Sequence, residues 1–179
     1  MFESLSRSTT TLREAGQAKG VMMGAAFNLN YISDSNYANT FLTQYGIGTA
    51  ENACKWGAIR PSQDKFNFDS CVDHFKLAIE NGQEFRGHNL CWGMWNPKWL
   101  EDFSGTADEL DAILKEHITT VMQKVRQLAG GNKILAWDVV NEAIADGSGT
   151  FKDAKPWYPL LPDYVDRAFK YARQADPDA

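Results

Sequence analysis

The chain has 179 residues, of which 44% are hydrophobic and 23% are charged, and its formal net charge is −5. This length allows one domain with a sizeable core, and the composition is ordinary for a globular protein. The acidic balance argues against nucleic acid or a membrane surface as a partner, because both attract basic patches. No apolar run approaches the roughly 20 residues needed to cross a bilayer, and no secretory signal pattern is visible in residues 1–20.

Three cysteines, Cys54, Cys71 and Cys91, are an odd number and too few for a disulfide scaffold. The sequence is compatible with one bridge and a free thiol, and equally with three buried thiols. No pair of histidines lies near the cysteines, so their spacing predicts no zinc site. We expect neither a metal nor another cofactor.

Hydrophobic periodicity predicts four strands, each followed by a helix. The expected strands cover 21–27, 47–50, 84–90 and 134–140, and the helices that follow them cover 36–45, 70–81, 106–129 and 163 onward. A short helix at 9–19 precedes the first strand. The strand at 134–140 is a short apolar run interrupted only by Asp138, so we expect it to be buried on both faces.

Residues with capping propensity flank the expected helices. Thr106 and Glu109 have the spacing of a capping box, and Asp163 is expected to cap the last helix. Asp34 or Ser35 is expected to cap the helix at 36–45, and Gly46 to end it. The buried stripes of the last two helices are expected to include Leu128 and Phe169.

This βα order predicts a parallel sheet with right-handed crossovers. Four such units fit either an open doubly wound sheet or the first half of a barrel. Neither GxGxxG nor GxxxxGK[ST] follows any expected strand, which weakens the doubly wound, nucleotide-binding alternative.

Polar side chains gather where the expected strands end, which is where parallel α/β folds place their chemistry. These residues are Asn28, Glu51, Asn52, Lys55, Arg86, His88, Trp92, Asn141 and Glu142. Each has an ordinary explanation alone: a core histidine, a solvated lysine or an arginine paired with a buried carboxylate. Together they predict a site for an uncharged ligand with many hydroxyl groups. Trp92, Trp95 and Trp99 are expected to line a loop at its mouth.

Three blocks carry a family resemblance: ENACKW at 51–56, RGHNLCW at 86–92 and WDVVNEA at 137–143. In order and spacing they resemble the blocks of family 10 glycoside hydrolases, the (β/α)8-barrel endo-1,4-β-xylanases. The resemblance runs from about residue 10 to the end. It implies that residues 1–179 are part of a catalytic domain of TIM-barrel type, with about the first four β/α units present.

The resemblance also implies a role for each residue in the blocks. Glu142 would be the acid/base carboxyl of a retaining mechanism, protonating the leaving oxygen and then activating water. Around the sugar at the cleaved bond it implies Asn141, on the 2-hydroxyl group, with Lys55, His88 and Trp92. The next sugar away from the reducing end would be held by Glu51 and Asn52, and the substrate would be xylan or a related β-1,4-glycan.

The nucleophile of the family is a glutamate on the seventh strand, whereas this sequence reaches only the end of the fourth helix. A full barrel needs roughly 250 residues, so we expect a fragment that lacks the nucleophile-bearing half. Glu51 is a weak substitute, and Asp138 is expected to point into the barrel interior. Two open sheet edges predict pairing with a complementary half or self-association.

A second departure follows Trp92, where Gly93-Met94-Trp95 stands in place of the usual His-Ser-Gln. Either Trp95 compensates by stacking on a sugar, or the preferred sugar differs. The alternative function is a non-catalytic half-barrel that binds xylan or its oligosaccharides. The resemblance implies an extracellular location.

Overall fold

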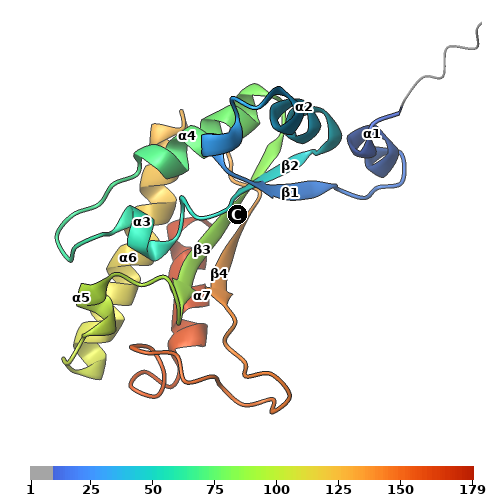
Figure 1. The fold of residues 1–179 in the computed structure, drawn as a ribbon. Coiled ribbons are helices and arrows are strands. Elements are labelled where there is room, and N and C mark those ends of the chain that lie inside the picture. The colour runs from blue at the N-terminus through green and yellow to red at the C-terminus, as the bar shows by residue number, and fades with distance from the viewer. Residues whose placement is uncertain (1–9) are drawn as a thin grey trace, which may run out of the picture.

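The computed structural model describes residues 10–179, and its centre is a parallel sheet (Figure 1). Among these residues the sheet has four strands in the order β1-β2-β3-β4. The strands are β1 (Gly24–Phe27), β2 (Ile47–Ala50), β3 (Glu84–Trp92) and β4 (Ala136–Asn141). The predicted order of strands and their parallel pairing are therefore confirmed.

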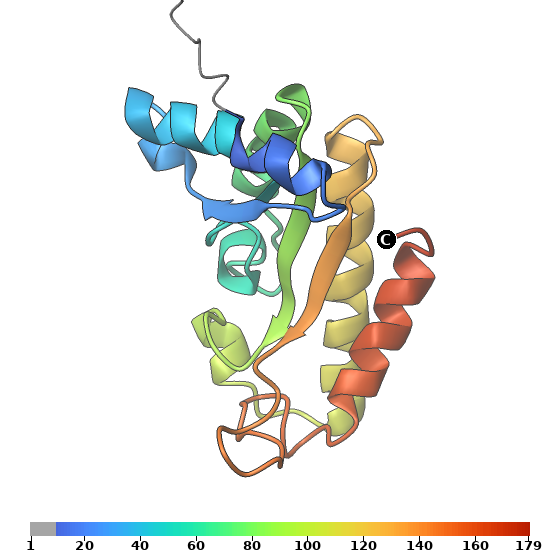
Figure 2. The same cartoon turned by 90° about the vertical axis from the view of Figure 1, so that its right-hand side faces the viewer.

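The helices α4, α6 and α7 lie along one side of this sheet (Figures 1 and 2). In chain order the helices are α1 (Leu12–Gln17), the 3-10 helix η1 (Leu29–Tyr31), α2 (Ser35–Gln44), α3 (Trp56–Ile59), α4 (Asp69–Glu80), α5 (Lys98–Glu101), α6 (Ala107–Leu128) and α7 (Tyr164–Ala175). The short helices η1, α3 and α5 were not predicted, because three or four residues are too few to show a period. The first residue of the helix predicted at 9–19 lies outside the described range.

Two of the four predicted caps are present, and two are not. The Thr106–Glu109 capping box is complete, and the Asp34 side chain accepts from the first backbone N–H groups of α2. Asp163 makes no side-chain cap; its carboxylate pairs with Arg167 Nε at 2.8 Å instead. Gly46 does not end α2 in a left-handed turn. It leads into β2, where its N–H donates to the carbonyl of Met23.

The strand at β4 is buried on one face only, which corrects the expectation that both faces are covered. Trp137 and Val139 are buried against the helices, while Ala136, Asp138 and Val140 on the opposite face are half-buried. An apolar run in the sequence indicates that a strand is hydrophobic, but it does not predict which other elements cover each face of that strand. Here the described helices cover one face of β4. The other face borders a partly polar cavity, which Asp138 helps to line.

Close packing under the sheet depends on aromatic rings and on one glycine. The rings of Phe27 and Phe41 stack at 4.2 Å between centroids, and Phe75 meets Phe85 at 5.1 Å. A Cβ at Gly87 would lie 2.2 Å from Trp137 Cε3. Only glycine therefore leaves room for the Trp137 ring against β3 at this position.

Two residues expected in buried helix stripes are exposed, Leu128 to 47% and Phe169 to 54%. Leu128 is the last residue of α6, and its neighbours Val125 and Ala129 are the residues buried at this end of the helix. Phe169 borders a cavity beside Trp137 and Val139, at the β4 edge of the sheet. The periodicity correctly predicted that Phe169 lies on the face of α7 that packs toward the sheet. No described element covers this part of that face.

One disulfide joins Cys54 to Cys71, while Cys91 is a buried free thiol. This decides between the two arrangements that the sequence left open. The bridge ties the loop after β2 to the first turn of α4. No helix among residues 10–179 is long and apolar enough to cross a membrane.

Reduction of the Cys54–Cys71 disulfide is expected to lower the free energy of unfolding by about 3 kcal/mol, because the bridge closes a short loop in the unfolded chain. Urea unfolding with and without a reductant measures the change. The double variant C54A/C71A is the control, and its midpoint should not respond to the reductant. Equal reductant effects on both proteins would contradict this prediction.

His117 is buried in α6 and stacks on Trp56, with 3.4 Å between ring centroids and an interplanar angle of 6°. Burial lowers the pKa of His117 well below its usual value, and the nearby Arg60 guanidinium lowers it further. Neither ring nitrogen has a partner among the described residues. The ring is therefore neutral in the folded chain.

Because His117 stays neutral in the folded chain, the unfolded chain binds more protons below its own histidine pKa of about 6.5. The free energy of unfolding should therefore fall as the pH drops below that value, with up to about 1.4 kcal/mol per pH unit from this one proton. The variant His117→Phe keeps the stacking and should show a shallower slope between pH 6.5 and 5. Identical slopes would show that His117 does not carry this effect.

Candidate functional site

Parallel pairing of β3 with β4 brings two of the predicted site residues side by side. Trp92 pairs with Asn141 in the ladder, at the carboxyl end of both strands. The next residue is Glu142, and Trp92 Nε1 donates to Glu142 Oε2 at 3.0 Å. The indole and the carboxylate thus meet on the rim because the register of the sheet places them there.

The backbone of Glu142 is in the left-handed region, with φ of 50°. A non-glycine residue in this region costs on the order of 1 kcal/mol, and such strain is concentrated at functional sites. The side chain is half-exposed, and Lys152 Nζ lies 3.5 Å from Oε2. Lys152 comes from the long loop between β4 and α7, and no sequence pattern pointed to it.

Lys55 is the most enclosed charge of the site, with only 8% of its surface exposed. Its Nζ donates to Asn52 Oδ1 at 2.7 Å and lies over two indole rings, 5.1 Å from the Trp92 centroid and 4.6 Å from that of Trp95. Burial lowers the pKa of Lys55, and the charges of Glu51 and Glu142 partly oppose this. Two carboxylates therefore act on one ammonium group.

Glu51 lies at the end of β2 and remains exposed. Asn28, just after β1, donates from Nδ2 to Glu51 Oε2 at 3.0 Å. Consecutive strand ends are thus linked by side chains: β1 to β2 through Asn28 and Glu51, and β3 to β4 through Trp92 and Glu142. The predicted rim residues at these strand ends therefore lie side by side in two pairs.

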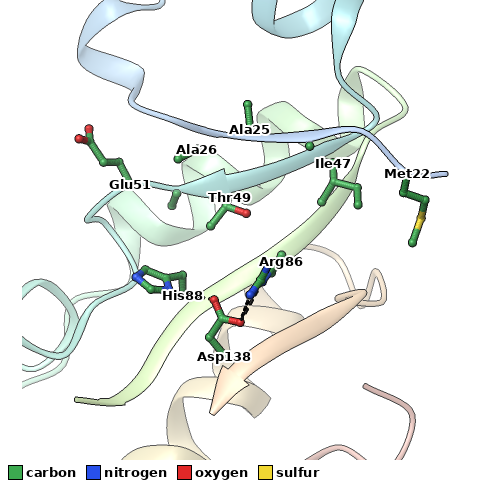
Figure 3. Close-up of a pocket in the computed structure, with 11 residues that line it drawn as sticks. Met22, Ala25, Ala26, Ile47, Thr49, Glu51, Arg86, His88 and Asp138 are labelled. Carbon is green, nitrogen blue, oxygen red and sulfur yellow. Dashed lines mark hydrogen bonds and ion pairs between the residues drawn. The ribbon is translucent and has the colours of Figure 1, made fainter. Parts of the chain in front are cut away.

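His88, Arg86 and Asp138 face a cavity of about 470 Å³ on the concave side of the sheet (Figure 3). Arg86 reaches Asp138 Oδ1 at 2.5 Å, and His88 Nδ1 lies 2.9 Å from Oδ2. Burial alone would raise the pKa of Asp138, but hydrogen bonds from His88 and Arg86 outweigh it and keep that pKa below its usual value. Asp138 thus lies on the side expected for a barrel interior, and its carboxylate is ionised and occupied. In Figure 3, Glu51 points away from this pair.

Trp99 does not line the mouth of the site, contrary to the prediction for the three clustered tryptophans. Its ring packs against the core, and its Nε1 donates to the carbonyl of Arg60 at 3.2 Å. Trp92 and Trp95 are the two that face Lys55. The clustering of the three tryptophans predicted one shared loop, but Trp99 lies in α5 and its ring packs against the core.

The amides and carboxylates of the rim can hydrogen-bond hydroxyl groups, and its indole faces can stack on a flat or ring-shaped ligand. The rim also carries the carboxyl group of Glu142, whose backbone is in a strained conformation. No group of three or more residues able to hold a metal ion occurs among the residues that the structure describes. A parallel α/β sheet with such a rim at its strand ends belongs to the class of folds that carry their ligand sites at the carboxyl ends of the strands.

Comparison with known proteins gives the family. The profile described as glycosyl hydrolase family 10 matches residues 11–179. Endo-1,4-β-xylanase B of Thermotoga neapolitana is 33% identical over 172 residues, which cover 94% of this chain and 48% of that protein. The β-1,4-xylanase of Dictyoglomus thermophilum is 35% identical, with 88% and 42% covered.

Solved structures agree with the sequence relatives. Xylanase 10B from Thermotoga petrophila RKU-1, in complex with xylobiose, superposes with a TM-score of 0.87 at 33% identity, covering 96% of this chain and 52% of that one. Native xylanase 10B from Thermotoga maritima gives 0.84 at 34% identity, covering 94% and 51%.

This chain belongs to glycosyl hydrolase family 10. It spans less than half the length of the two curated relatives. The four parallel strands described here, with their helices, form a partial (β/α) barrel. The predicted family and fold are therefore confirmed.

Neutralising Glu142 is expected to lower the pKa of Lys55 further, since the charge of Glu142 now raises it. Nitrogen-15 NMR of the lysine side chains, with Glu142→Gln against the unmodified chain, measures this pKa. Glu101→Gln, an exposed carboxylate on α5, is the matched control and should leave it unchanged. If the pKa of Lys55 is unchanged in both variants, the charge of Glu142 does not raise it and the prediction is wrong.

Proposed function

We propose that residues 1–179 are the part of a retaining endo-1,4-β-xylanase domain that carries the acid/base carboxyl and the subsites on its non-reducing side. The observation that carries this proposal is the pairing at the end of β4. There Glu142 sits in a strained backbone conformation with the Trp92 indole on its carboxylate.

Glu142 is suited to protonate a leaving group. The Trp92 N–H and the Lys152 ammonium both approach Oε2. Oε1 is therefore the oxygen free to carry a proton to a glycosidic oxygen and, in the second step, to accept one from water. Half of the side chain remains exposed, so a substrate can reach it.

The other proposed contacts divide between two sugars. Asn141, Lys55, His88 and Trp92 would hold the sugar at the cleaved bond. This assignment is supported by the Trp92 ring, which hydrogen-bonds Glu142, lies below Lys55 Nζ and is 6.5 Å from the His88 ring between centroids. Asn52 accepts from Lys55, and Glu51 lies beside the same loop, so these two residues would hold the next sugar. The buried ammonium group of Lys55 would donate to hydroxyl groups of both sugars.

The substrate proposed is β-1,4-xylan or a related β-1,4-glycan. The Thermotoga petrophila structure that this chain resembles contains xylobiose, and a Cellvibrio japonicus xylanase at a TM-score of 0.81 and 28% identity contains xylopentaose. We propose an extracellular location and no cofactor. The open edges at β1 and β4 would be covered by a complementary half-barrel or by self-association.

A second candidate function, oligosaccharide binding without turnover by these residues alone, is favoured by the state of the other acids. Retention requires a second carboxylate about 5 Å from the first. Asp138 is held by Arg86 and His88, and Glu51 accepts from Asn28. Asp138 has two partners on the concave face and Glu51 belongs to the end of another strand, so we propose that the nucleophile comes from outside the residues described here.

Hydrolysis of an aryl β-xylobioside by the 179-residue chain, together with calorimetric binding of xylobiose, tests both candidates. If turnover occurs on a substrate with a poor leaving group, Glu142→Gln should lower kcat by about 10²- to 10⁴-fold, the usual contribution of a general acid. Glu101→Gln, the exposed carboxylate on α5, is the matched control and should leave the rate unchanged.

The outcomes separate the candidates. Turnover that depends on Glu142 supports the acid/base role. Binding of xylobiose without turnover supports the second candidate. Turnover that survives Glu142→Gln would contradict the proposed role, and the absence of both binding and turnover would reject the site itself.

A further inference from the structure

Residues 51–55 form the turn between β2 and α3, and Asn52 and Lys55 of this turn are proposed to bind sugar. Cys54 stands directly before Lys55, and its side chain is buried. The disulfide joins Cys54 to Cys71, which lies in the first turn of α4. The buried ammonium group of the rim thus belongs to a residue whose neighbour is covalently attached to a helix that packs on the sheet (Figure 1).

Hydrogen bonds anchor the start of this turn but not its middle. The N–H of Glu51 donates to the carbonyl of Phe27 at 2.9 Å, just before residues 52–54. Among the described residues, 52–54 make hydrogen bonds only within the turn, where Asn52 accepts from both the backbone N–H and the Nζ of Lys55. Within the part of the chain that the structure describes, the disulfide is therefore the only bond that ties the middle of the turn to another element.

Packing around the disulfide is incomplete, because a cavity of about 630 Å³ is walled in part by the turn and by α4. Asn52 and Ala53 line it from the turn, and Ser70 and His74 line it from α4. A close-packed interior would hold the turn in place by itself. Here the turn borders open space instead, so the disulfide is what keeps it from moving into the cavity.

The surroundings of Lys55 depend on where the turn places it. Its Nζ lies 5.1 Å from the centroid of the Trp92 ring and 4.6 Å from that of Trp95. Burial is the largest influence on the pKa of Lys55 and lowers it. A shift of the turn toward the cavity would expose the ammonium group, separate it from the two rings and let its pKa rise toward the usual value.

We propose that Cys54 and Cys71 are positioning residues of the rim, whose disulfide holds Asn52 and Lys55 where these bind sugar hydroxyls. Both cysteines are buried, so the bond is a permanent link and not a switch within reach of reductants. Two side chains that are in place before a ligand arrives lower the entropic cost of binding. The effect on sugar binding rests on the proposed function, whereas the effect on Lys55 does not.

Two measurements on the 179-residue chain separate positioning from a general gain in stability. Nitrogen-15 NMR gives the pKa of Lys55, with its signal assigned by its loss in the variant Lys55→Met. Calorimetry gives the Kd for xylobiose. Both are made without denaturant, where a less stable but folded chain keeps the same pKa values and the same affinity unless its rim has changed.

In C54A/C71A, the pKa of Lys55 should rise toward its usual value, and xylobiose should bind about tenfold more weakly, which is the ordering cost of one or two side chains. Val125→Ala is the matched control, because it removes buried side-chain volume in the last turn of α6 and so destabilises the fold without touching the turn. It should change neither the pKa of Lys55 nor the affinity.

If C54A/C71A does not fold, reduction of the unmodified chain by a dithiol gives the same comparison. The pKa of Lys55 should then rise on reduction, the affinity for xylobiose should fall, and both should return on re-oxidation. A change that re-oxidation does not reverse would count against the disulfide as its cause.

An unchanged or lower pKa of Lys55 without the disulfide would overturn the proposal, as would equal effects of Val125→Ala. A raised pKa with unchanged xylobiose affinity would overturn it too, because Lys55 would then be positioned without consequence for the rim. A raised pKa in a chain that binds no xylobiose with or without the disulfide would reject the proposed function and keep the positioning of Lys55.

Discussion

The register of β3 against β4 is the constraint on which the site depends. It places Trp92 beside Asn141 and therefore the indole N–H beside the Glu142 carboxylate. The register shifts between His88 and Cys91, so His88 faces the concave cavity while Trp92 reaches the rim. The pairing of β3 with β4 thus places His88 and Trp92, four residues apart on one strand, in two different parts of the structure.

Charges at the strand ends are arranged in two groups with different roles. Asp138 is held by two partners on the concave face, and its pKa is kept low by them. Lys55 is buried beside indole rings and feels Glu51 and Glu142 from two sides. The first group lies on the concave face of the partial barrel, and the second leaves a polar rim on which the carboxyl groups of Glu51 and Glu142 are accessible.

The sequence predicted the strands, their parallel order and the rim, because these depend on local hydrophobic period and on residues placed at strand ends. It failed where the outcome depends on neighbours distant in the chain. Phe169 and Leu128 are exposed although their period is correct, and β4 is covered on one face only. The ring of Trp99 packs against the core, and Lys152 comes from a loop in which no sequence pattern pointed to it. The cysteine pairing required three-dimensional proximity.

The central claim is that Trp92, Lys55 and Glu142 form one sugar-binding rim. Nitrogen-15 NMR of the tryptophan indoles during titration with xylobiose tests it most directly, with assignments from single Trp→Phe variants. The account predicts that the Trp92 and Trp95 signals move together and saturate at one Kd, while those of buried Trp56 and Trp157 stay in place. Unmoved Trp92 signals at saturating xylobiose, or shifts confined to other tryptophans, would contradict it.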